Sequence, residues 1–525
     1  MMPDRAVLEF RNLSFRYPAA DGWALEDLSF ALRKGELIAV IGGNGAGKSS
    51  LCKCANGIIP HSEGGFLKGR VFTAGLDTRA HPVSVLAREA GLVLEDPDAQ
   101  LFATTVLNEA AFGPENLGLE PAVIRVIAAE LLSAVGLAGL DARPPSTLSG
   151  GQKQRLAVAA ALAMKAGILV LDEPTSRLDG EGSEALMDLL GELKKCRGLA
   201  ILMATHDLDL VRRHADRVLV LEKGKILALD TPERVLAAES RRAPSFPFRE
   251  TAGEFIVAAD QRGARDVLEM ENATSVYPGG IAALRNVGFK AGAGEFIGIV
   301  GRNGSGKTTL LKCLTGLVEP FPGKVLIKGR DLADLSPPEL AARVAYVQQN
   351  PDLQLFSDTV RKEAAFGPVN LGFGREETDR RVRRALGLVG LSGKAEEHPL
   401  GLDRTDRALT ALASAIAMES AVLLLDEPTC GQDHAGAIRI MEIIRALRNE
   451  GRTVLVVGHD LRLLARYADR LLVMDGGAIV ADGAAGDLLS RKDMLQDAGL
   501  RVPHDLDGRG ADGNAPSTRK ETICV

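Results

Sequence analysis

The chain has 525 residues, a net charge of −6, and 46% hydrophobic and 25% charged residues, an ordinary composition for a globular protein. Its length suffices for two to four domains of about 100–200 residues each. It has no basic arm and only 4% aromatic residues, so we expect no nucleic-acid partner. No run reaches the ~20 apolar residues of a membrane span, and the N-terminus lacks an apolar signal core. Six cysteines without metal-ligand spacing are expected to be free thiols in a reducing cytoplasm.

The earliest aromatic residue with a candidate role is Tyr17, which precedes a proline and lies 31 residues before Lys48. Tyr277 also precedes a proline and lies 30 residues before Lys307. An aromatic ring at this position could stack on adenine. The alternative is a tyrosine that packs at the edge of a sheet.

The first glycine-rich loop, GGNGAGKS at 42–49, follows the apolar run ELIAVIG and fits G-x-x-x-x-G-K-[ST]. Its glycines let backbone N–H groups turn toward phosphate oxygens, and the start of the next helix adds a positive dipole. We expect Lys48 to reach the β- and γ-phosphates and Ser49 to bind Mg²⁺. A single match could be a glycine turn in a generic α/β domain, but GRNGSGKT at 301–308 repeats the motif after EFIGIVG. The predicted nucleotide-binding residues of the two loops are Gly42, Asn44, Gly45, Gly47, Lys48, Ser49 and Ser50, and Gly301, Asn303, Gly304, Gly306, Lys307, Thr308 and Thr309.

Acidic pairs end two further apolar runs, Asp172–Glu173 after ILVL and Asp426–Glu427 after VLLL. The first carboxylate of each pair can hold Mg²⁺ through water, and the second can act as a general base. The next apolar runs end in His206 and His459, which could contact the γ-phosphate. Solvated loop acids and surface histidines are the alternatives, but their repetition beside two phosphate-binding loops favours the catalytic interpretation. Apolar runs that alternate with helical stretches predict an α/β fold, with a mostly parallel sheet flanked by helices.

The chain is a tandem repeat. From Glu95 to Glu173 the first half matches the second at a constant offset of 254 residues, so that AFGPENLG at 111–118 falls on AFGPVNLG at 365–372. A match of this length indicates duplication. We expect one domain at 1–240, a linker at 241–265 and a second domain at 266–492. The polar, glycine-rich end of the segment 493–525 predicts a disordered tail.

The segment LSGGQKQR at 148–155 lies just ahead of a predicted helix and, together with LDEPT at 171–175, closely resembles the signature of the ATP-binding cassette (ABC) ATPases. The resemblance implies two tandem P-loop NTPase (ABC ATPase) domains, each with a helical subdomain, that use ATP and Mg²⁺ and pair within the chain. It further implies that the signature of one half completes the ATP site of the other. The signature residues that would meet the γ-phosphate are Ser149, Gly150, Gly151 and Gln152.

The second half has no intact signature. The constant offset places LDRTDRAL at 402–409 in its position, so Ser149 becomes Asp403, Gly150 becomes Arg404 and Gly151 becomes Thr405. A carboxylate is repelled by a γ-phosphate in a low-dielectric site, and the loss of glycine removes the close backbone approach.

The two halves also differ in the segment before the helical region, which is called the Q-loop in this family. Gln349 in YVQQNPD matches the family's metal- and water-contacting glutamine, whereas its counterpart is Glu95. The resemblance therefore implies one complete and one degenerate ATP site. The alternative is neutral drift with both sites active, because Glu173 and His206 remain. The candidate catalytic residues are Glu427, His459, Gln349, Glu173 and His206, and the candidate Mg²⁺ ligands are Ser49, Asp172, Thr308, Gln349 and Asp426.

The segments DPDAQLFATTVLNEAAFGPENLGL and NPDLQLFSDTVRKEAAFGPVNLGF are similar to a stretch typical of energy-coupling factor (ECF) transporter ATPases. These ATPases drive uptake of vitamins or transition-metal ions. The resemblance implies a transmembrane coupling component and a substrate-capture membrane subunit as partners, with peripheral attachment at the cytoplasmic face of the cell membrane. It also implies that Glu109 and Glu363 meet arginines of the coupling component through charge-assisted contacts. A solvated helix face is the alternative for these glutamates.

Two other functions stay open at this point. Fused ATPases of sugar importers also have two cassettes, although they generally lack the QLF…AFGP…NLG stretch that is present twice here. A soluble, ribosome-associated ABC-F ATPase is expected to carry two intact signatures and a long charged linker. Neither the transported substrate nor the membrane partners can be named from the sequence.

Overall fold

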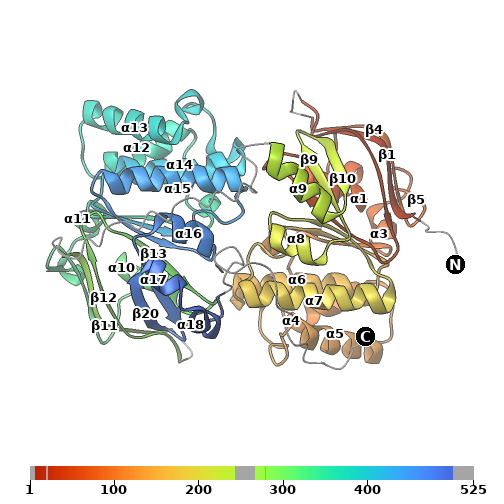
Figure 1. Ribbon diagram of the computed structural model, residues 1–525, viewed down its shortest axis with the longest axis horizontal. Coiled ribbons are helices and arrows are strands. Elements are labelled where there is room, and N and C mark those ends of the chain that lie inside the picture. The colour runs from red at the N-terminus through yellow and green to blue at the C-terminus, as the bar shows by residue number, and fades with distance from the viewer. Residues whose placement is uncertain (1–5, 19, 21, 243–265, 278–279, 501–525) are drawn as a thin grey trace. The chain divides into compact units, whose positions relative to one another are not determined.

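The computed structural model describes residues 6–18, 20, 22–242, 266–277 and 280–500 (Figure 1). The described residues form two compact units, with 6–242 in the first and 266–500 in the second. All but two residues of the expected linker, 241–265, lie outside the described ranges.

The main sheet of the first unit has six strands in the order β10-β9-β3-β8-β7-β6, and all of them except the edge strand β10 run parallel. These strands are β3 (Leu37–Ile41), β6 (Ala90–Val93), β7 (Ile168–Asp172), β8 (Ala200–Ala204), β9 (Arg217–Glu222) and β10 (Lys225–Asp230). The three central strands β3, β7 and β8 are buried along their whole length, as expected for a parallel sheet with both faces covered. The α/β architecture predicted from the apolar runs is confirmed.

Helices cover the main sheet of the first unit, and three of them form a helical subdomain. The helices α4, α5 and α6 pack against one another (Figure 1). They are α4 (Val106–Asn116), α5 (Pro121–Ala134) and α6 (Gly150–Ala163). The other helices are α1 (Lys48–Ala55), α2 (Ile58–His61), α3 (Val83–Leu86), α7 (Gly180–Arg197), α8 (Leu208–His214) and α9 (Pro232–Arg242). The segment 148–155, expected just ahead of a helix, instead overlaps it, because α6 begins at Gly150 with Ser149 as its N-cap.

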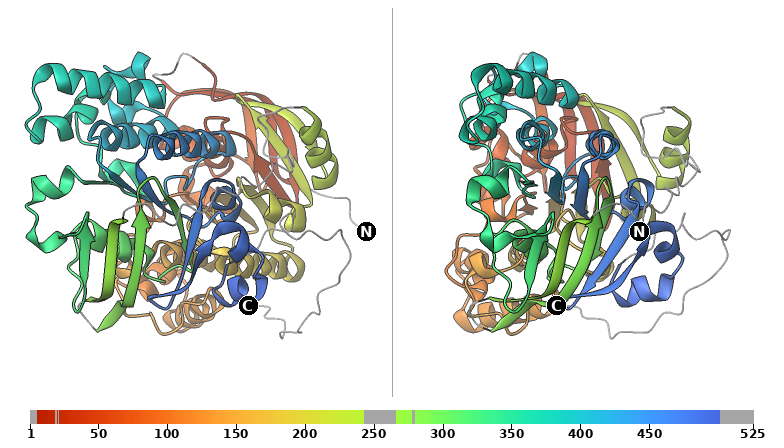
Figure 2. Two further views of the ribbon diagram at one scale, coloured as in Figure 1. Left: turned by 60° about the vertical axis from the view of Figure 1, so that its left-hand side comes forward. Right: turned by 90° about the vertical axis from the view of Figure 1, so that its left-hand side faces the viewer.

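The second unit repeats this plan, with a six-stranded sheet in the order β16-β17-β18-β13-β19-β20. Its strands are β13 (Phe296–Gly301), β16 (Val344–Val347), β17 (Val422–Asp426), β18 (Thr453–Val457), β19 (Arg470–Asp475) and β20 (Ala478–Ala484). The helices α12, α13 and α14 gather at one end of this unit in every view (Figure 2). Its helices are α10 (Lys307–Leu314), α11 (Pro337–Ala341), α12 (Val360–Asn370), α13 (Arg375–Val389), α14 (Arg404–Ala417), α15 (His434–Asn449), α16 (Leu461–Tyr467), α17 (Ala485–Leu489) and α18 (Lys492–Asp497).

Each unit also carries an antiparallel four-stranded sheet that the sequence analysis did not anticipate. In the first unit it consists of β1 (Ala6–Arg16), β2 (Leu25–Arg33), β4 (Phe66–Thr73) and β5 (Leu76–Asp77), and in the second of β11 (Asp266–Tyr277), β12 (Ile281–Gly292), β14 (Lys324–Ile327) and β15 (Arg330–Asp331). Leu8, Phe10, Leu13 and Phe15 of β1 join one hydrophobic cluster with one face of the main sheet. Because these residues are spaced two or three apart, the pattern of a half-buried strand was present in the sequence.

The second domain extends beyond its expected end at residue 492. Helix α18 continues the fold, and Leu495, Ala498 and Leu500 are buried in the core of this unit. Residues 493–500 therefore belong to the fold and not to the expected tail, because three apolar side chains in this segment bury surface that a disordered chain would expose. Residues 501–525 lie outside the described ranges.

Candidate functional site

The two glycine-rich loops have the same backbone conformation. Gly47 and Gly306, each directly before the first helical residue, have φ angles of 104° and 101°. A β-carbon at these positions would lie 2.5 and 2.4 Å from a backbone carbonyl oxygen, so both the backbone angle and the space require glycine. Helices α1 and α10 then begin at Lys48 and Lys307, which places a helix N-terminus at each loop.

The lysine amines turn back over their own loops. Nζ of Lys48 donates to the carbonyl oxygens of Gly42 and Gly43, at 2.9 and 3.2 Å. Nζ of Lys307 donates in the same way to the carbonyls of Gly301 and Arg302, both at 2.8 Å. Both amines are thereby held at the concave side of a loop whose N–H groups can bind phosphate.

Tyr17 and Tyr277 lie beside the same two helices. The hydroxyl of Tyr17 is 3.0 Å from Oγ of Ser50, and that of Tyr277 is 3.3 Å from Oγ1 of Thr309. Each tyrosine is therefore tied to the first turn of the helix that follows the glycine-rich loop. This position is compatible with stacking on adenine, which stays a prediction.

The residues that would hold Mg²⁺ are brought together in both units. The hydroxyls of Ser49 and Thr308 lie close enough to the carboxylates of Asp172 and Asp426 to act against the rise in their pKa. Burial raises the pKa of both aspartates. Oδ1 of Asp172 is buried without a hydrogen-bond partner, so the carboxylate retains a free acceptor of the kind that a hard cation binds. The residues present therefore fit Mg²⁺.

Glu173 and Glu427 occupy equivalent, strained positions. Both have positive φ angles, 50° and 47°, directly after their strands. The backbone N–H of Glu173 donates to Ala204 of β8, and that of Glu427 donates to Val457 of β18, both at 3.0 Å. The parallel sheet thus determines where each carboxylate lies, at the carboxyl ends of the strands.

The surroundings of the two glutamates differ. In the first unit, Nε2 of His206 lies 3.2 Å from Oε1 of Glu173 and 3.1 Å from Nζ of Lys48. Burial raises the pKa of Glu173 to about 7, although Lys48 acts in the opposite direction. At this pKa the carboxyl is protonated in a large fraction of molecules at neutral pH.

In the second unit, Nε2 of Gln349 donates to Oε2 of Glu427 at 2.9 Å, and Nδ1 of His459 lies 3.6 Å from the same oxygen. Burial again favours the neutral form, but His459, Lys307 and Gln349 outweigh it and hold the pKa of Glu427 below its usual value. A carboxylate that stays ionised can accept a proton from water. The second unit thus brings together all three of its predicted catalytic residues.

The starts of α6 and α14 keep the same backbone but different side chains. Ser149 caps α6 in a capping box with Gln152. Asp403 caps α14, where its Oδ1 accepts from the N–H of Asp406 at 2.9 Å. The substituted residues at 403–405 therefore occupy the position of the signature, as the offset of 254 predicted, and Asp403 takes over the structural role of Ser149.

The expectation that Glu109 and Glu363 meet a membrane partner is wrong. Their side chains are only 4% and 3% exposed. Oε2 of Glu109 accepts from the backbone N–H groups of Phe102 and Ala103, at 2.9 and 2.7 Å, and Oε2 of Glu363 accepts from those of Phe356 and Ser357, at 3.0 and 2.7 Å. Each glutamate accepts hydrogen bonds from backbone N–H groups of the preceding loop, which lie outside any helix or strand. Its carboxylate therefore faces its own domain.

Two features of the site were missed in the sequence. Tyr346 donates its hydroxyl to Oδ2 of Asp426 at 3.2 Å, and the equivalent residue in the first unit is Leu92. Arg177, just after Glu173, bonds Oδ1 of Asp96 at 2.8 Å. Only the alignment of the two halves at positions 92 and 346 could have drawn attention to the tyrosine.

The ABC transporter family profile matches residues 25–176 and 284–430, one copy in each unit. The chain belongs to the ABC transporter family. Its two matched domains are ATP-binding domains, and the chain is an ATPase of this family. Among the described residues, no helix combines the length and apolar character that a bilayer crossing requires.

Relatives match over nearly the whole chain. A protein of Caldanaerobacter subterraneus subsp. tengcongensis is 36% identical over 96% of this chain and 95% of its own length, and one of Methanosarcina acetivorans is 35% identical over 94% and 89%. Both carry the words ABC transporter ATP-binding protein in their names. The solved structure of CbiO1 from Clostridium perfringens, described as part of the ABC transporter complex CbiONQ, is 30% identical. The match covers 46% of this chain and 98% of CbiO1, with a TM-score of 0.41.

Proposed function

We propose that this ABC ATPase is the energy-coupling subunit of an ECF-type importer. It drives uptake of a vitamin or a transition-metal ion through a transmembrane coupling component and a substrate-capture subunit, from the cytoplasmic face of the membrane. The observation that carries the proposal is the ECF-like segment from the Q-loop to the NLG sequence, which occurs in both halves with the same local structure.

That segment exposes an aromatic pair in each unit. Phe102 and Phe112 stack edge to face with ring centroids 4.7 Å apart, and Phe356 and Phe366 repeat this geometry at the same distance. Phe102 is 66% exposed and Phe356 64% exposed. Because large exposed apolar groups mark interaction sites, these pairs replace the glutamates as the proposed contact with the coupling component.

The roles of the chain's own groups in ATP hydrolysis follow from the site. Lys48 and Lys307 bind phosphate, and Glu427 accepts the proton of the attacking water while His459 and Gln349 orient its carboxylate. Mg²⁺, when bound at the Ser49–Asp172 and Thr308–Asp426 pairs, would neutralise phosphate charge.

The two sites are proposed to be unequal. Burial raises the pKa of Glu173 to about 7, so part of its carboxyl is protonated at neutral pH and cannot accept a proton, and the substituted residues 403–405 lack the signature glycines. That each signature completes the site of the other half remains a prediction from the family resemblance.

The test is co-purification of the full-length chain with a polytopic membrane protein from detergent-solubilised membranes of the native host. We expect the double variant Phe102→Asp/Phe356→Asp to lose this partner, since a charge at the centre of an apolar contact is costly to bury. ATP binding should be unchanged, because both side chains are exposed and neither residue belongs to a glycine-rich loop. The matched control is Phe66→Asp on β4, 54% exposed, which lies outside the ECF-like segment.

Three outcomes would refute the proposal. The wild-type chain could recover ribosomes instead of a membrane protein. It could recover a membrane partner that the Phe102→Asp/Phe356→Asp variant retains. The control could lose the partner as completely as the double variant, in which case the aromatic pairs are not the contact.

A further inference from the structure

In both units an arginine lies between the loop after the strand-end glutamate and the start of the equivalent helix, α6 or α14. The arginine belongs to the loop in the first unit and to the helix in the second. In the first unit it is Arg177, from the loop that follows Glu173. Its side chain passes over Gly150, because a β-carbon at Gly150 would lie 3.7 Å from Cδ of Arg177. The guanidinium then reaches the Q-loop, where it bonds Asp96 at 2.8 Å and lies 3.5 Å from Asp98.

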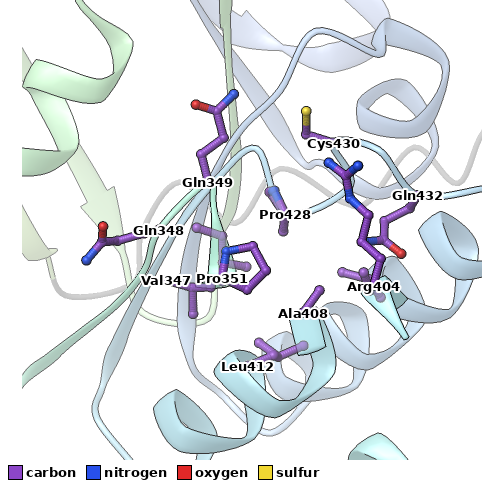
Figure 3. Close-up of a pocket in the computed structure, with 12 residues that line it drawn as sticks. Val347, Gln348, Gln349, Pro351, Arg404, Ala408, Leu412, Pro428, Cys430 and Gln432 are labelled. Atoms are coloured by element: carbon purple, nitrogen blue, oxygen red, sulfur yellow. The ribbon is translucent and has the colours of Figure 1, made fainter. Parts of the chain in front are cut away.

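In the second unit, the positions of arginine and glycine are exchanged. Position 404, equivalent to Gly150, is arginine, and position 431, equivalent to Arg177, is glycine. The guanidinium of Arg404 lies directly against Gly431, where a β-carbon would come within 2.1 Å of Cζ and of Nη2. A side chain at position 431 would therefore have to displace the guanidinium of Arg404. Figure 3 shows Arg404 rising from α14 toward Cys430 and Gln432, beside a small cavity lined by all three.

A third position changes with them. Asp96, the partner of Arg177, is Asn350 in the second unit. The oxygens of both side chains accept from the N–H two residues later, at 3.1 Å, so the local turn is the same. Asn350 therefore keeps the turn but lacks the negative charge with which Asp96 pairs with Arg177 in the first unit. The neighbouring ion pair is kept, as Lys153–Asp98 at 2.5 Å in the first unit and Arg407–Asp352 at 2.8 Å in the second.

The loop after Glu427 is connected to the catalytic carboxylate through its backbone. The N–H of Cys430 donates to the carbonyl of Glu427 at 3.0 Å, and the N–H of Gln432 donates to that of Thr429 at 3.1 Å. A displacement of Gly431 would therefore be transmitted to Glu427, whose φ angle of 47° is strained.

We propose that Arg404 is a positioning residue that braces the loop 428–433 against the start of α14 and so holds Glu427 in place. Arg404 thus takes the place of Arg177, but it extends from the helix to the loop and not from the loop to the helix. Its guanidinium points into its own unit, toward the loop after Glu427, so Arg404 is no ligand of the nucleotide. The inference rests on the proposed function, because it takes Glu427 to be the catalytic carboxylate.

The test is a mutant cycle in the full-length chain, with kcat and KM for ATP hydrolysis and the melting temperature as readouts. We expect Arg404→Gly and Gly431→Arg each to lower kcat about tenfold or more, the first by freeing the loop and the second by overlap with Arg404 and by strain at position 431, where φ is 64°. The triple variant Asn350→Asp/Arg404→Gly/Gly431→Arg restores the three residue types of the first unit, and its loop must also give up the φ angle of 64° at position 431, which Arg177 does not share. It should recover kcat to within about threefold of wild type.

The apparent KM for ATP should change by less than about twofold in the variants that fold, because the proposed role affects turnover and not binding. Arg404→Lys serves as the milder variant where Arg404→Gly lowers the melting temperature too far. It keeps the charge, loses the planar fork, and should lose kcat without a change in KM.

Three results would overturn the inference. Gly431→Arg could lower kcat by the same factor in the Arg404→Gly background as in the wild type. The cycle could show coupling in melting temperature but none in kcat, which would make the contact merely structural. Arg404→Lys could raise KM with kcat unchanged, which would make the arginine a nucleotide ligand. Glu427→Gln, measured alongside, tests the catalytic assignment by itself: full activity in that variant would refute the proposed function without reference to the arginine exchange.

Discussion

Replacing Glu109 by alanine should unlock the loop that presents Phe102. The carboxylate accepts two backbone hydrogen bonds, at 2.9 and 2.7 Å, and is buried. Hydrogen bonds to a charged group contribute about 1.5–3 kcal/mol each, so the loss of both should cost the closed loop roughly 3 kcal/mol or more. At about 1.4 kcal/mol per factor of ten, this corresponds to an increase of about 100-fold in local opening.

The measurement is hydrogen–deuterium exchange by mass spectrometry on peptides that cover residues 101–105. Exchange is a local readout and therefore does not require two-state unfolding, which a chain of two units is not expected to follow. We expect the amides of Phe102 and Ala103 to exchange about 100-fold faster in Glu109→Ala. The matched control is Glu115→Ala, an exposed glutamate on the same helix, which should leave these amides unchanged.

The opposite result would refute the reasoning. If Glu109→Ala leaves exchange at 102–103 at the wild-type rate, the carboxylate does not hold the loop. If it abolishes membrane attachment without faster exchange, the glutamate contacts the partner directly, as the sequence alone had indicated. The equivalent change, Glu363→Ala, should act on Phe356 and Ser357 in the same way, because its two hydrogen bonds are nearly identical.

Three further predictions concern the second unit. Glu427→Gln should lower steady-state ATPase activity by about 100-fold, the scale of a lost general base, whereas Glu173→Gln should have a much smaller effect; equal losses would contradict unequal sites. Gln349→Glu places a second carboxylate beside Glu427 and should reduce kcat by about tenfold or more through like-charge repulsion, a result that a conservative Gln349→Asn control should not reproduce in full. Leu495→Ala should destabilise the second unit by about 2–5 kcal/mol in thermal unfolding, and an unchanged melting temperature would show that α18 is not part of its core.

The phosphate-binding loops and the strand-end residues were predictable because their chemistry is tied to backbone conformation. At Gly47 the φ angle is 104° and a β-carbon has no room, so only glycine fits. The loop conformation can therefore be recognised from the sequence. The same holds for Asp172 and Glu173, since the end of a buried parallel strand is recognisable from its apolar run. Here local sequence and three-dimensional position are nearly equivalent.

The role of Glu109 could not be read in this way. Its place in the first turn of α4 is compatible with a side chain that faces solvent or one that turns back over the preceding loop. The path of the chain at 102–103 decides between these orientations, and no periodicity encodes it. The exchange between Arg177 and Arg404 was hidden for a similar reason. Each substitution is visible in the aligned halves, but only the contact shows that they belong together.

The duplication separates what the fold requires from what each site does. Features that both units share, such as the glutamate that holds the Q-loop amides and the lysine that folds over its glycine-rich loop, have the same geometry twice. Three of the differences between the halves lie around the acidic pair at the end of β17, where Leu92, Glu95 and Gly150 are replaced by Tyr346, Gln349 and Arg404. Tyr346 bonds Asp426, Gln349 bonds Glu427, and Arg404 contacts the loop that follows. All three substitutions therefore bear on one acidic pair and the loop after it, and Gln349 is among the groups that hold the pKa of Glu427 below its usual value.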